Sequence, residues 1–221
     1  MKLFLASIGM FTKVKVNSNV FENNSGPGMI CFLPLAGAFC GAFTALVYWL
    51  CMRYEVNAML AAAILLFSLF FVSGFLHLDG FMDCSDALLS ARDREGKVRI
   101  LKDSTVGAFS VISVCLLLLV DFSSLYVLYS QNTDFLSFIL IPFASRAFIA
   151  VVLFTFKPLE NNKGLLFFFR DGMKKYHIVL CIVQFVVVSA VFALINLNLF
   201  YALMLSSVIS FLVCKTAERI L

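Results

Sequence analysis

Residues 58–76 have the sequence AMLAAAILLFSLFFVSGFL and lead without a break into residues 77–86, HLDGFMDCSD. The first segment is continuously apolar and close to the ~20 residues that a helix needs to cross the hydrocarbon core of a bilayer. Because its hydrophobicity does not alternate, it favours a membrane helix over a strand of a transmembrane barrel. The second segment adds three carboxylates. Together they predict a membrane-spanning helix that continues past its apolar part into a polar site.

The rest of the chain has the same apolar character. Hydrophobic residues make up 62% of its 221 positions and charged residues 14%, whereas soluble proteins have about a quarter charged residues. Further stretches long and apolar enough to span a membrane are 29–52, 106–130, 135–156, 177–195 and 197–214. We therefore predict an all-α, polytopic integral membrane protein with about six transmembrane helices, in which residues 1–221 form a single membrane domain.

Lysine and arginine are distributed unevenly around these stretches. With six crossings, the N-terminal segment, the segments after the second and fourth spans, and the C-terminal tail share one side of the membrane. These segments hold nearly all of the 17 basic residues: Lys2, Lys13, Lys15, Arg92, Arg94, Lys97, Arg99, Lys102, Lys157, Lys163, Arg170, Lys174, Lys175, Lys215 and Arg219. Cytoplasmic loops carry the excess of Lys and Arg. We therefore predict both termini in the cytoplasm, with residues 1–28 as an interfacial segment and residues 77–105 as a cytoplasmic helix–loop–helix.

The net charge of +4 thus reflects membrane topology. No basic patch interleaved with aromatic residues occurs in a soluble segment, so we expect the lipid bilayer, and not a nucleic acid, as the macromolecular surroundings. The oligomeric state is left open, and a homo-oligomer is compatible with the sequence.

Asp79, Asp83 and Asp86 stand at positions i, i+4 and i+7, which share one face of a helix. Crowded carboxylates repel one another unless a cation joins them, and hard divalent ions such as Mg²⁺ prefer carboxylate oxygens. Asp103 follows after a charged connector and is predicted to complete the cluster from the facing helix. Carboxylates from both walls of a cleft would suit a pair of metal ions acting on a phosphorylated substrate.

Polar and small residues near these aspartates are candidate substrate contacts. Lys102 could hold phosphate oxygens and Ser104 could donate a hydrogen bond. Gly80 and Gly107 would let the backbone approach a ligand closely. The alternative for the charged connector, residues 92–97, is a solvated loop without a role in the site.

His77 and Arg146 each allow two interpretations. His77 does not share a helical face with Asp79, so it is either an interfacial hydrogen-bonding residue or a substrate contact. Arg146 lies near the middle of an apolar stretch, where a charge is costly and should face the protein interior. It either pairs with Asp121 or binds a substrate phosphate.

These residues resemble the motifs of the cobalamin synthase family, formally the adenosylcobinamide-GDP ribazoletransferases. The resemblance runs from about Phe11 to the end of the chain. It is carried by His77-Leu78-Asp79-Gly80-x-x-Asp83-x-x-Asp86 and by Leu101-Lys102-Asp103-Ser104-x-x-Gly107, and supported by Phe32-x-Pro34-Leu35-x-Gly37, Ser145-Arg146 and Gly164-Leu165.

The resemblance implies an enzyme of the prokaryotic cytoplasmic (inner) membrane, with its active site facing the cytoplasm. It would transfer the adenosylcobinamide phosphoryl group from adenosylcobinamide-GDP to α-ribazole or α-ribazole 5′-phosphate and release GMP, with Mg²⁺ as cofactor. Asp79, Asp83, Asp86 and Asp103 would hold the metal, and Asp86 or Asp103 would act as general base. The site is also similar to that of CDP-alcohol phosphotransferases.

The chain departs from the family pattern in three places. Ala87 replaces a usual glycine, and Thr105 replaces a usual arginine that would contact phosphate. The family also continues with a Gly-Asp-x-x-Gly-Ala segment beyond the position of Leu221, so we expect activity to depend on whether that segment is present.

Two other functions are compatible with the composition. A lipid-synthesising CDP-alcohol phosphotransferase would use similar aspartates, but the Ala-Arg pair and the later Gly-x-x-x-Asp-x-x-x-Asp of that family are absent. A cation-coupled transporter would place its ionisable residues near the middle of the membrane. The aspartates of this chain are predicted at the cytoplasmic boundary instead, which disfavours a transporter.

Overall fold

The computed structural model describes residues 2–21, 26–156 and 164–220. Every regular element in these ranges is helical. The helices are α1 (Lys2–Phe11), the 3₁₀ turn η1 (Ser18–Val20), α2 (Gly26–Cys31), α3 (Leu33–Arg53), α4 (Ala58–Ser73), α5 (Leu76–Leu89), α6 (Arg94–Ile100), α7 (Ala108–Ser130), α8 (Leu136–Thr155), α9 (Gly164–Arg170), α10 (Lys175–Ile195) and α11 (Leu197–Ile220). The all-α prediction is confirmed.

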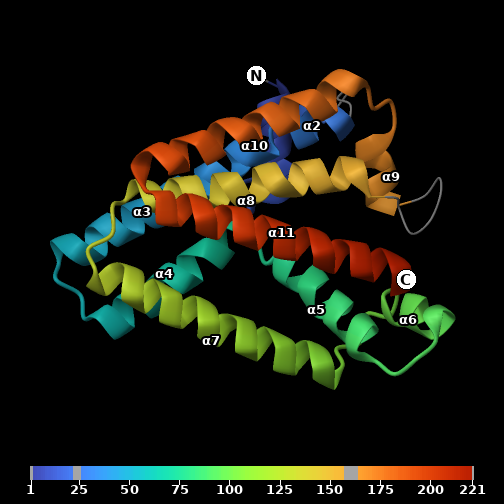
Figure 1. The fold of residues 1–221 in the computed structure, drawn as a ribbon, viewed down its shortest axis with the longest axis horizontal. Coiled ribbons are helices and arrows are strands. Elements are labelled where there is room, and N and C mark those ends of the chain that lie inside the picture. The colour runs from blue at the N-terminus through green and yellow to red at the C-terminus, as the bar shows by residue number, and fades with distance from the viewer. Residues whose placement is uncertain (1, 22–25, 157–163, 221) are drawn as a thin grey trace.

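Five helices, α3, α7, α8, α10 and α11, are long and apolar enough to cross a membrane, and α4 with α5 would make a sixth crossing. The five long helices match the predicted stretches to within a few residues, except that α11 continues past the predicted end at 214 to Ile220. In Figure 1 the connections α3–α4, α7–α8 and α10–α11 lie at one end of the molecule. The opposite end holds α6, α9 and the C-terminal end of α11. The segments that follow the predicted second and fourth spans and the C-terminal tail therefore lie at the same end of the molecule (Figure 1), although Lys157 and Lys163 lie outside the described residues.

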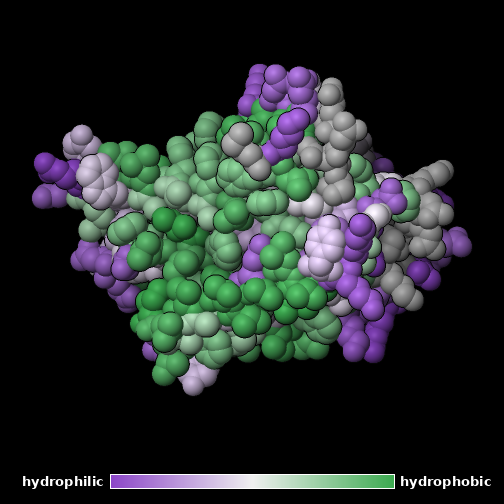
Figure 2. All heavy atoms as spheres, turned by 90° about the horizontal axis from the view of Figure 1, so that it is seen from above, coloured by the Kyte–Doolittle hydropathy of each residue, from purple (hydrophilic) through white to green (hydrophobic). Residues whose placement is uncertain are grey.

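The surface agrees with this arrangement. Figure 2 shows a broad apolar area over the middle of one face, with polar side chains gathered toward its edges. Many large apolar side chains are exposed, among them Leu116, Leu119, Val120 and Leu205. Side chains of this kind are stable against lipid and costly in water.

The tightest helix packing joins α3 to α8. Gly37 and Gly41 stand four residues apart on α3, and α8 passes directly over both. A Cβ added at Gly37 would lie 2.5 Å from the carbonyl oxygen of Pro142, and one at Gly41 would lie 2.8 Å from the Cα of Ile139. The glycines therefore allow the two backbones to touch, as small residues do in membrane helix pairs.

The N-terminal segment packs into this bundle. Ala6 and Ser7 of α1 are fully buried, and Ile8 and Phe11 belong to an apolar core shared with α2, α3, α8, α9 and α10. Residues 22–25 of the predicted interfacial segment lie outside the described residues.

The prediction that the second span continues as one straight helix into the carboxylate segment is wrong. The chain bends by 93° between α4 and α5. Gly74 and Phe75 both have a left-handed backbone, with φ of 73° and 63°, and this conformation ends a helix. The backbone N–H of Lys13 donates to the carbonyl of Val72 at 2.9 Å, so the N-terminal segment satisfies a carbonyl that the bend leaves free.

Candidate functional site

Helix α5 carries the predicted metal-binding carboxylates and packs along α7. Asp79 is exposed, Asp83 is half-buried and Asp86 is buried. Asp79 and Asp86 both act electrostatically on Asp83, so each of them is near enough to Asp83 to repel its charge. Neither Asp79 nor Asp83 makes a hydrogen bond or ion pair with any described residue. Their oxygens are therefore available to a ligand.

Asp86 is instead fixed to the start of α7. Its Oδ2 accepts a hydrogen bond of 2.7 Å from the backbone N–H of Gly107, and its Oδ1 accepts one of 2.9 Å from the N–H of Ser110. These two donors belong to the first turn of α7, whose N–H groups have no partner within the helix. A carboxylate at this position is favoured by hydrogen bonding and by the helix dipole. Asp86 thus caps α7 from a neighbouring helix.

The C-terminal end of α5 is capped by a lysine. Lys97 of α6 is only 9% exposed, and its Nζ donates to the carbonyl oxygens of Ala87, Leu88 and Ser90 at 3.2, 3.0 and 2.8 Å. One ammonium group has three donors, so Lys97 is fully satisfied. The connector, for which a solvated loop is the alternative interpretation, therefore includes a buried residue that fixes the end of the carboxylate helix. A lone lysine in a run of charges gives no sequence signal for this role.

Asp103 lies in the loop between α6 and α7. Its Oδ1 accepts a hydrogen bond of 3.0 Å from the N–H of Thr105, and this bond holds the pKa of the Asp103 carboxyl below its ordinary value. Asp103 also lines a polar pocket of about 370 Å³ with Arg92, which precedes α6, and with Arg99 and other residues of α6. The predicted contacts Lys102 and Ser104 are exposed beside it.

The structure does not bring Asp103 into the α5 group. Within the described ranges, no group of three or more His, Cys, Asp or Glu side chains lies close enough to hold a metal ion. Asp79 and Asp83 form a pair with free oxygens, Asp86 faces α7, and Asp103 faces the polar pocket.

The two predicted glycines differ in their surroundings. A Cβ added at Gly107 would lie 2.7 Å from Cγ of Asp86, so the α5–α7 contact requires glycine at this position. At Gly80 a Cβ would meet nothing within 4 Å. The helix face beside Asp79 therefore opens onto free space.

Arg146 and His77 lie together inside the bundle. The charge of Arg146 acts on His77 and on Cys40, and its side chain lies over Gly37. The Nε2 atom of His77 is buried and has no hydrogen-bond partner in the described part of the chain. No described carboxylate bonds to Arg146, so the structure does not form the alternative pair with Asp121. His77, just after the helix bend, thus lies near Arg146, which stands midway along α8.

The sequence also matches known proteins. A model of the cobalamin-5-phosphate synthase family matches residues 3–221. Curated relatives named adenosylcobinamide-GDP ribazoletransferase include a protein of Clostridium perfringens strain 13, which is 38% identical over 99% of this chain and 89% of its own length. Others are a protein of Clostridium botulinum strain Eklund 17B (32% identical; 88% and 77% covered) and one of Geobacillus strain WCH70 (30% identical; 78% and 66% covered). No solved structure gives a significant match. A family match over nearly the whole chain, together with these relatives, shows that the chain belongs to the cobalamin-5-phosphate synthase family.

Proposed function

We propose that this protein is an adenosylcobinamide-GDP ribazoletransferase of the bacterial inner membrane. Its donor is adenosylcobinamide-GDP, and its acceptor is α-ribazole or α-ribazole 5′-phosphate. Family membership supports this activity. The observation that carries it is the pair Asp79 and Asp83, which stand one turn apart on a fixed helix with free carboxylate oxygens above an open face.

The reaction exchanges one phosphorus–oxygen bond for another. A hydroxyl oxygen of the ribazole attacks the phosphorus that bears the cobinamide arm, and the bond from this phosphorus to the bridging oxygen of GMP breaks. The hydroxyl proton goes to a general base, and GMP leaves with the bridging oxygen. The products are adenosylcobalamin, or its phosphate, and GMP.

The α5 carboxylates fit Mg²⁺. Two unpaired, mutually repelling carboxylates are relieved by a bound divalent cation, so Asp79 and Asp83 would be its first ligands. Asp86 stays a predicted ligand, because a carboxylate has about four acceptor positions and its two backbone bonds use only some of them. Asp103 lies outside the α5 group, so its role as a ligand rests on the family resemblance alone. When bound, the ion would neutralise pyrophosphate charge.

Arg146 and His77 are suited to a phosphate of the donor. A buried guanidinium without a carboxylate partner is costly, and an anionic ligand would remove that cost. The free Nε2 of His77 could bond to the same phosphate group. Arginine binds phosphate oxygens in a bidentate way, which would fix the orientation of the donor.

Asp103 is the better candidate of the two predicted general bases. Both oxygens of Asp86 already accept backbone N–H bonds, which hold this residue in place. Asp103 uses one oxygen for Thr105 and keeps the other free, in a polar pocket on the side that we assign to the cytoplasm.

The decisive assay uses membranes that contain the protein, supplied with adenosylcobinamide-GDP, α-ribazole and Mg²⁺. We expect GMP release matched by formation of the nucleotide-bearing corrinoid, and loss of both on removal of Mg²⁺ by a chelator. Asp79→Asn and Asp83→Asn should lose turnover while keeping the melting temperature of the wild type. A folded wild-type preparation without product would overturn the activity, and active Asn variants would remove these residues from the metal site.

A further inference from the structure

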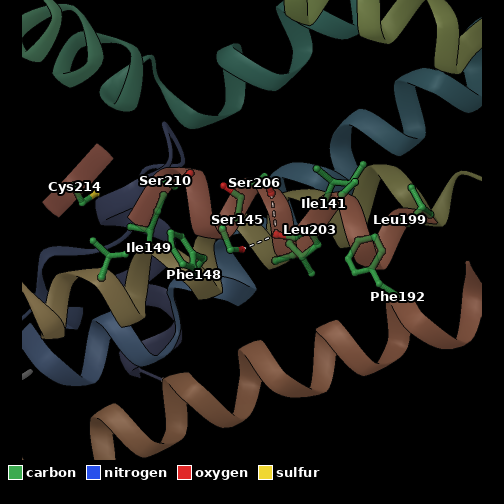
Figure 3. A pocket seen from close by; sticks show the side chains of 14 residues that line it. Ile141, Ser145, Phe148, Ile149, Phe192, Leu199, Leu203, Ser206, Ser210 and Cys214 are labelled. Carbon is green, nitrogen blue, oxygen red and sulfur yellow. Dashed lines mark hydrogen bonds between the residues drawn. The ribbon is translucent and has the colours of Figure 1, made fainter. Parts of the chain in front are cut away.

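A large pocket lies between α8, α10 and α11 (Figure 3). Its volume is about 530 Å³, within the range of small-molecule sites. Most of its wall is apolar, with Ile141 and Phe148 from α8, Phe192 from α10, and Leu199 and Leu203 from α11.

A row of small polar side chains crosses this apolar wall. Ser206, Ser210 and Cys214 follow one another at four-residue intervals on α11, and Ser145 contributes from α8. The hydroxyl of Ser206 donates to the carbonyl of Leu203 in its own helix (Figure 3). Ser145 and Ser210 make no hydrogen bond with any described residue. Free hydroxyl groups at membrane depth lose hydrogen bonds that water would supply, so they favour a ligand with polar atoms.

The helix that lines most of this pocket also lies beside the carboxylate helix. Leu88 of α5 lines a second, smaller pocket together with Leu212 and Val213 of α11. A molecule bound along α11 could therefore extend one end toward α5.

We propose that this pocket binds the acceptor nucleoside, α-ribazole, with its flat heteroaromatic base among the apolar side chains and its polar atoms on the serine row. This inference rests on the proposed function. The acceptor must bring a hydroxyl to a phosphorus beside α5, so the rest of the molecule has to occupy space that adjoins this helix. The pocket provides that space.

Size and polarity select this occupant. The donor combines a corrin ring with a nucleotide and is much larger than a space of 530 Å³. A lipid acyl chain would fit the apolar wall, but it has no atoms to bond with Ser145 or Ser210. A heteroaromatic nucleoside has both an apolar surface and hydrogen-bonding atoms.

The test fills the pocket and leaves α5 unchanged. Ala202 lines the pocket, whereas Val208 on the same helix does not line it and is 56% exposed. We expect Ala202→Phe to raise the KM for α-ribazole about tenfold or more, with the KM for adenosylcobinamide-GDP within about twofold of wild type. The matched variant Val208→Phe should leave both constants unchanged.

Ser210→Ala provides a second, milder variant that keeps the packing of α11. Loss of one hydrogen bond should weaken α-ribazole binding about fivefold, measured by calorimetry on the solubilised protein without donor. An unchanged KM and affinity for α-ribazole in both variants would overturn the proposal. If wild type instead retains a phospholipid that Ala202→Phe loses, the pocket belongs to lipid. Absence of GMP release by wild type would contradict the activity alone, since nucleoside binding is measured without turnover.

Discussion

Asp86 and Gly107 are joined by a hydrogen bond of 2.7 Å from the backbone N–H of Gly107 to Oδ2 of Asp86. This bond crosses from the end of the carboxylate helix α5 to the beginning of α7. The absence of a side chain at Gly107 is what allows the carboxylate to approach. The most acidic segment of the chain is therefore held by a backbone contact, and its distance from α7 is fixed before any ligand binds.

Gly107→Ala should weaken this contact. The new methyl group would overlap the carboxylate of Asp86, so we expect a loss of about 1–3 kcal/mol in stability, as for other overpacked sites. The measurement is the free energy of unfolding in detergent. Gly80→Ala is the matched control, because nothing lies within 4 Å of its added Cβ and alanine is favoured in a helix by about 0.5–1 kcal/mol. Equal stabilities for the two variants would contradict the contact.

Lys97→Met should destabilise the end of α5. The substitution keeps an apolar stem but leaves the carbonyl oxygens of Ala87, Leu88 and Ser90 without their donor. We expect a loss of about 2 kcal/mol or more, since hydrogen bonds to charged groups are worth about 1.5–3 kcal/mol. Arg92→Met changes an exposed cation of the same connector and should have little effect on the melting temperature. A melting temperature for Lys97→Met equal to that of Arg92→Met would show that the buried ammonium contributes nothing.

Gly41→Ala should disturb the α3–α8 pair. The added methyl would lie 2.8 Å from the Cα of Ile139 and would force the helices apart, at a cost of about 1–3 kcal/mol. Ala42→Leu on the exposed side of α3 adds more volume, yet it should be tolerated because it faces lipid. Thermal unfolding of the two variants distinguishes helix contact from general sensitivity of α3.

Asp103→Asn should separate charge from loop structure. The asparagine Oδ1 can still accept the hydrogen bond from the Thr105 N–H, so the loop should keep its fold. Asparagine cannot take the proton of the ribazole hydroxyl during phosphoryl transfer, so turnover should fall at least about 100-fold. The pKa of Asp103 is lowered in the folded state by the Thr105 N–H. Its ionised form therefore stabilises the fold above the ordinary aspartate pKa, and this contribution disappears as pH falls through the lowered pKa.

The same variant accordingly predicts a pH-dependent difference in stability. Wild type should be slightly more stable than Asp103→Asn at neutral pH, and the two should converge below about pH 4. Melting curves over this range provide the measurement. A difference that grows on acidification would reverse the sign and contradict the assignment.

Arg146→Gln should weaken donor binding and leave acceptor binding unchanged. If Arg146 binds a phosphate of adenosylcobinamide-GDP, its loss should raise the KM for the donor at least about tenfold, because charge-assisted hydrogen bonds are worth about 1.5–3 kcal/mol. The control is Asp121→Asn, which should leave that KM unchanged, because Asp121 makes no bond to Arg146 in the structure. If Arg146→Gln lowered expression and the double variant Arg146→Gln/Asp121→Asn restored it, the two residues would be partners after all.

Much of the fold follows from local sequence properties. The apolar stretches predict the long helices to within a few residues because each has to satisfy its backbone groups internally in lipid. The bend after Ser73 was missed because two consecutive left-handed residues, one of them Phe75, arise from tertiary contacts such as the bond from Lys13 to Val72. Gly74 alone indicates the bend less strongly than the two left-handed residues do together.

The site was predictable in its chemistry and less so in its geometry. The i, i+4, i+7 pattern correctly places Asp79 and Asp83 near each other, but no spacing rule distinguishes an aspartate that faces a ligand from one, like Asp86, that caps another helix. The role of Lys97 and the serine row on α11 depend on which helices meet. Contacts between distant segments of this kind cannot be read from helical periodicity.

Because the helix is broken between α4 and α5, a tilt of α4 in the bilayer need not move the carboxylates on α5. Membrane helices tilt when the thickness of the hydrocarbon layer changes, and a continuous helix would carry that tilt to its polar end. Here α5 is anchored by α6 and α7, so a change in the inclination of α4 is taken up at Gly74 and Phe75. We therefore expect the spacing of the acidic groups to stay the same in membranes of different lipid composition.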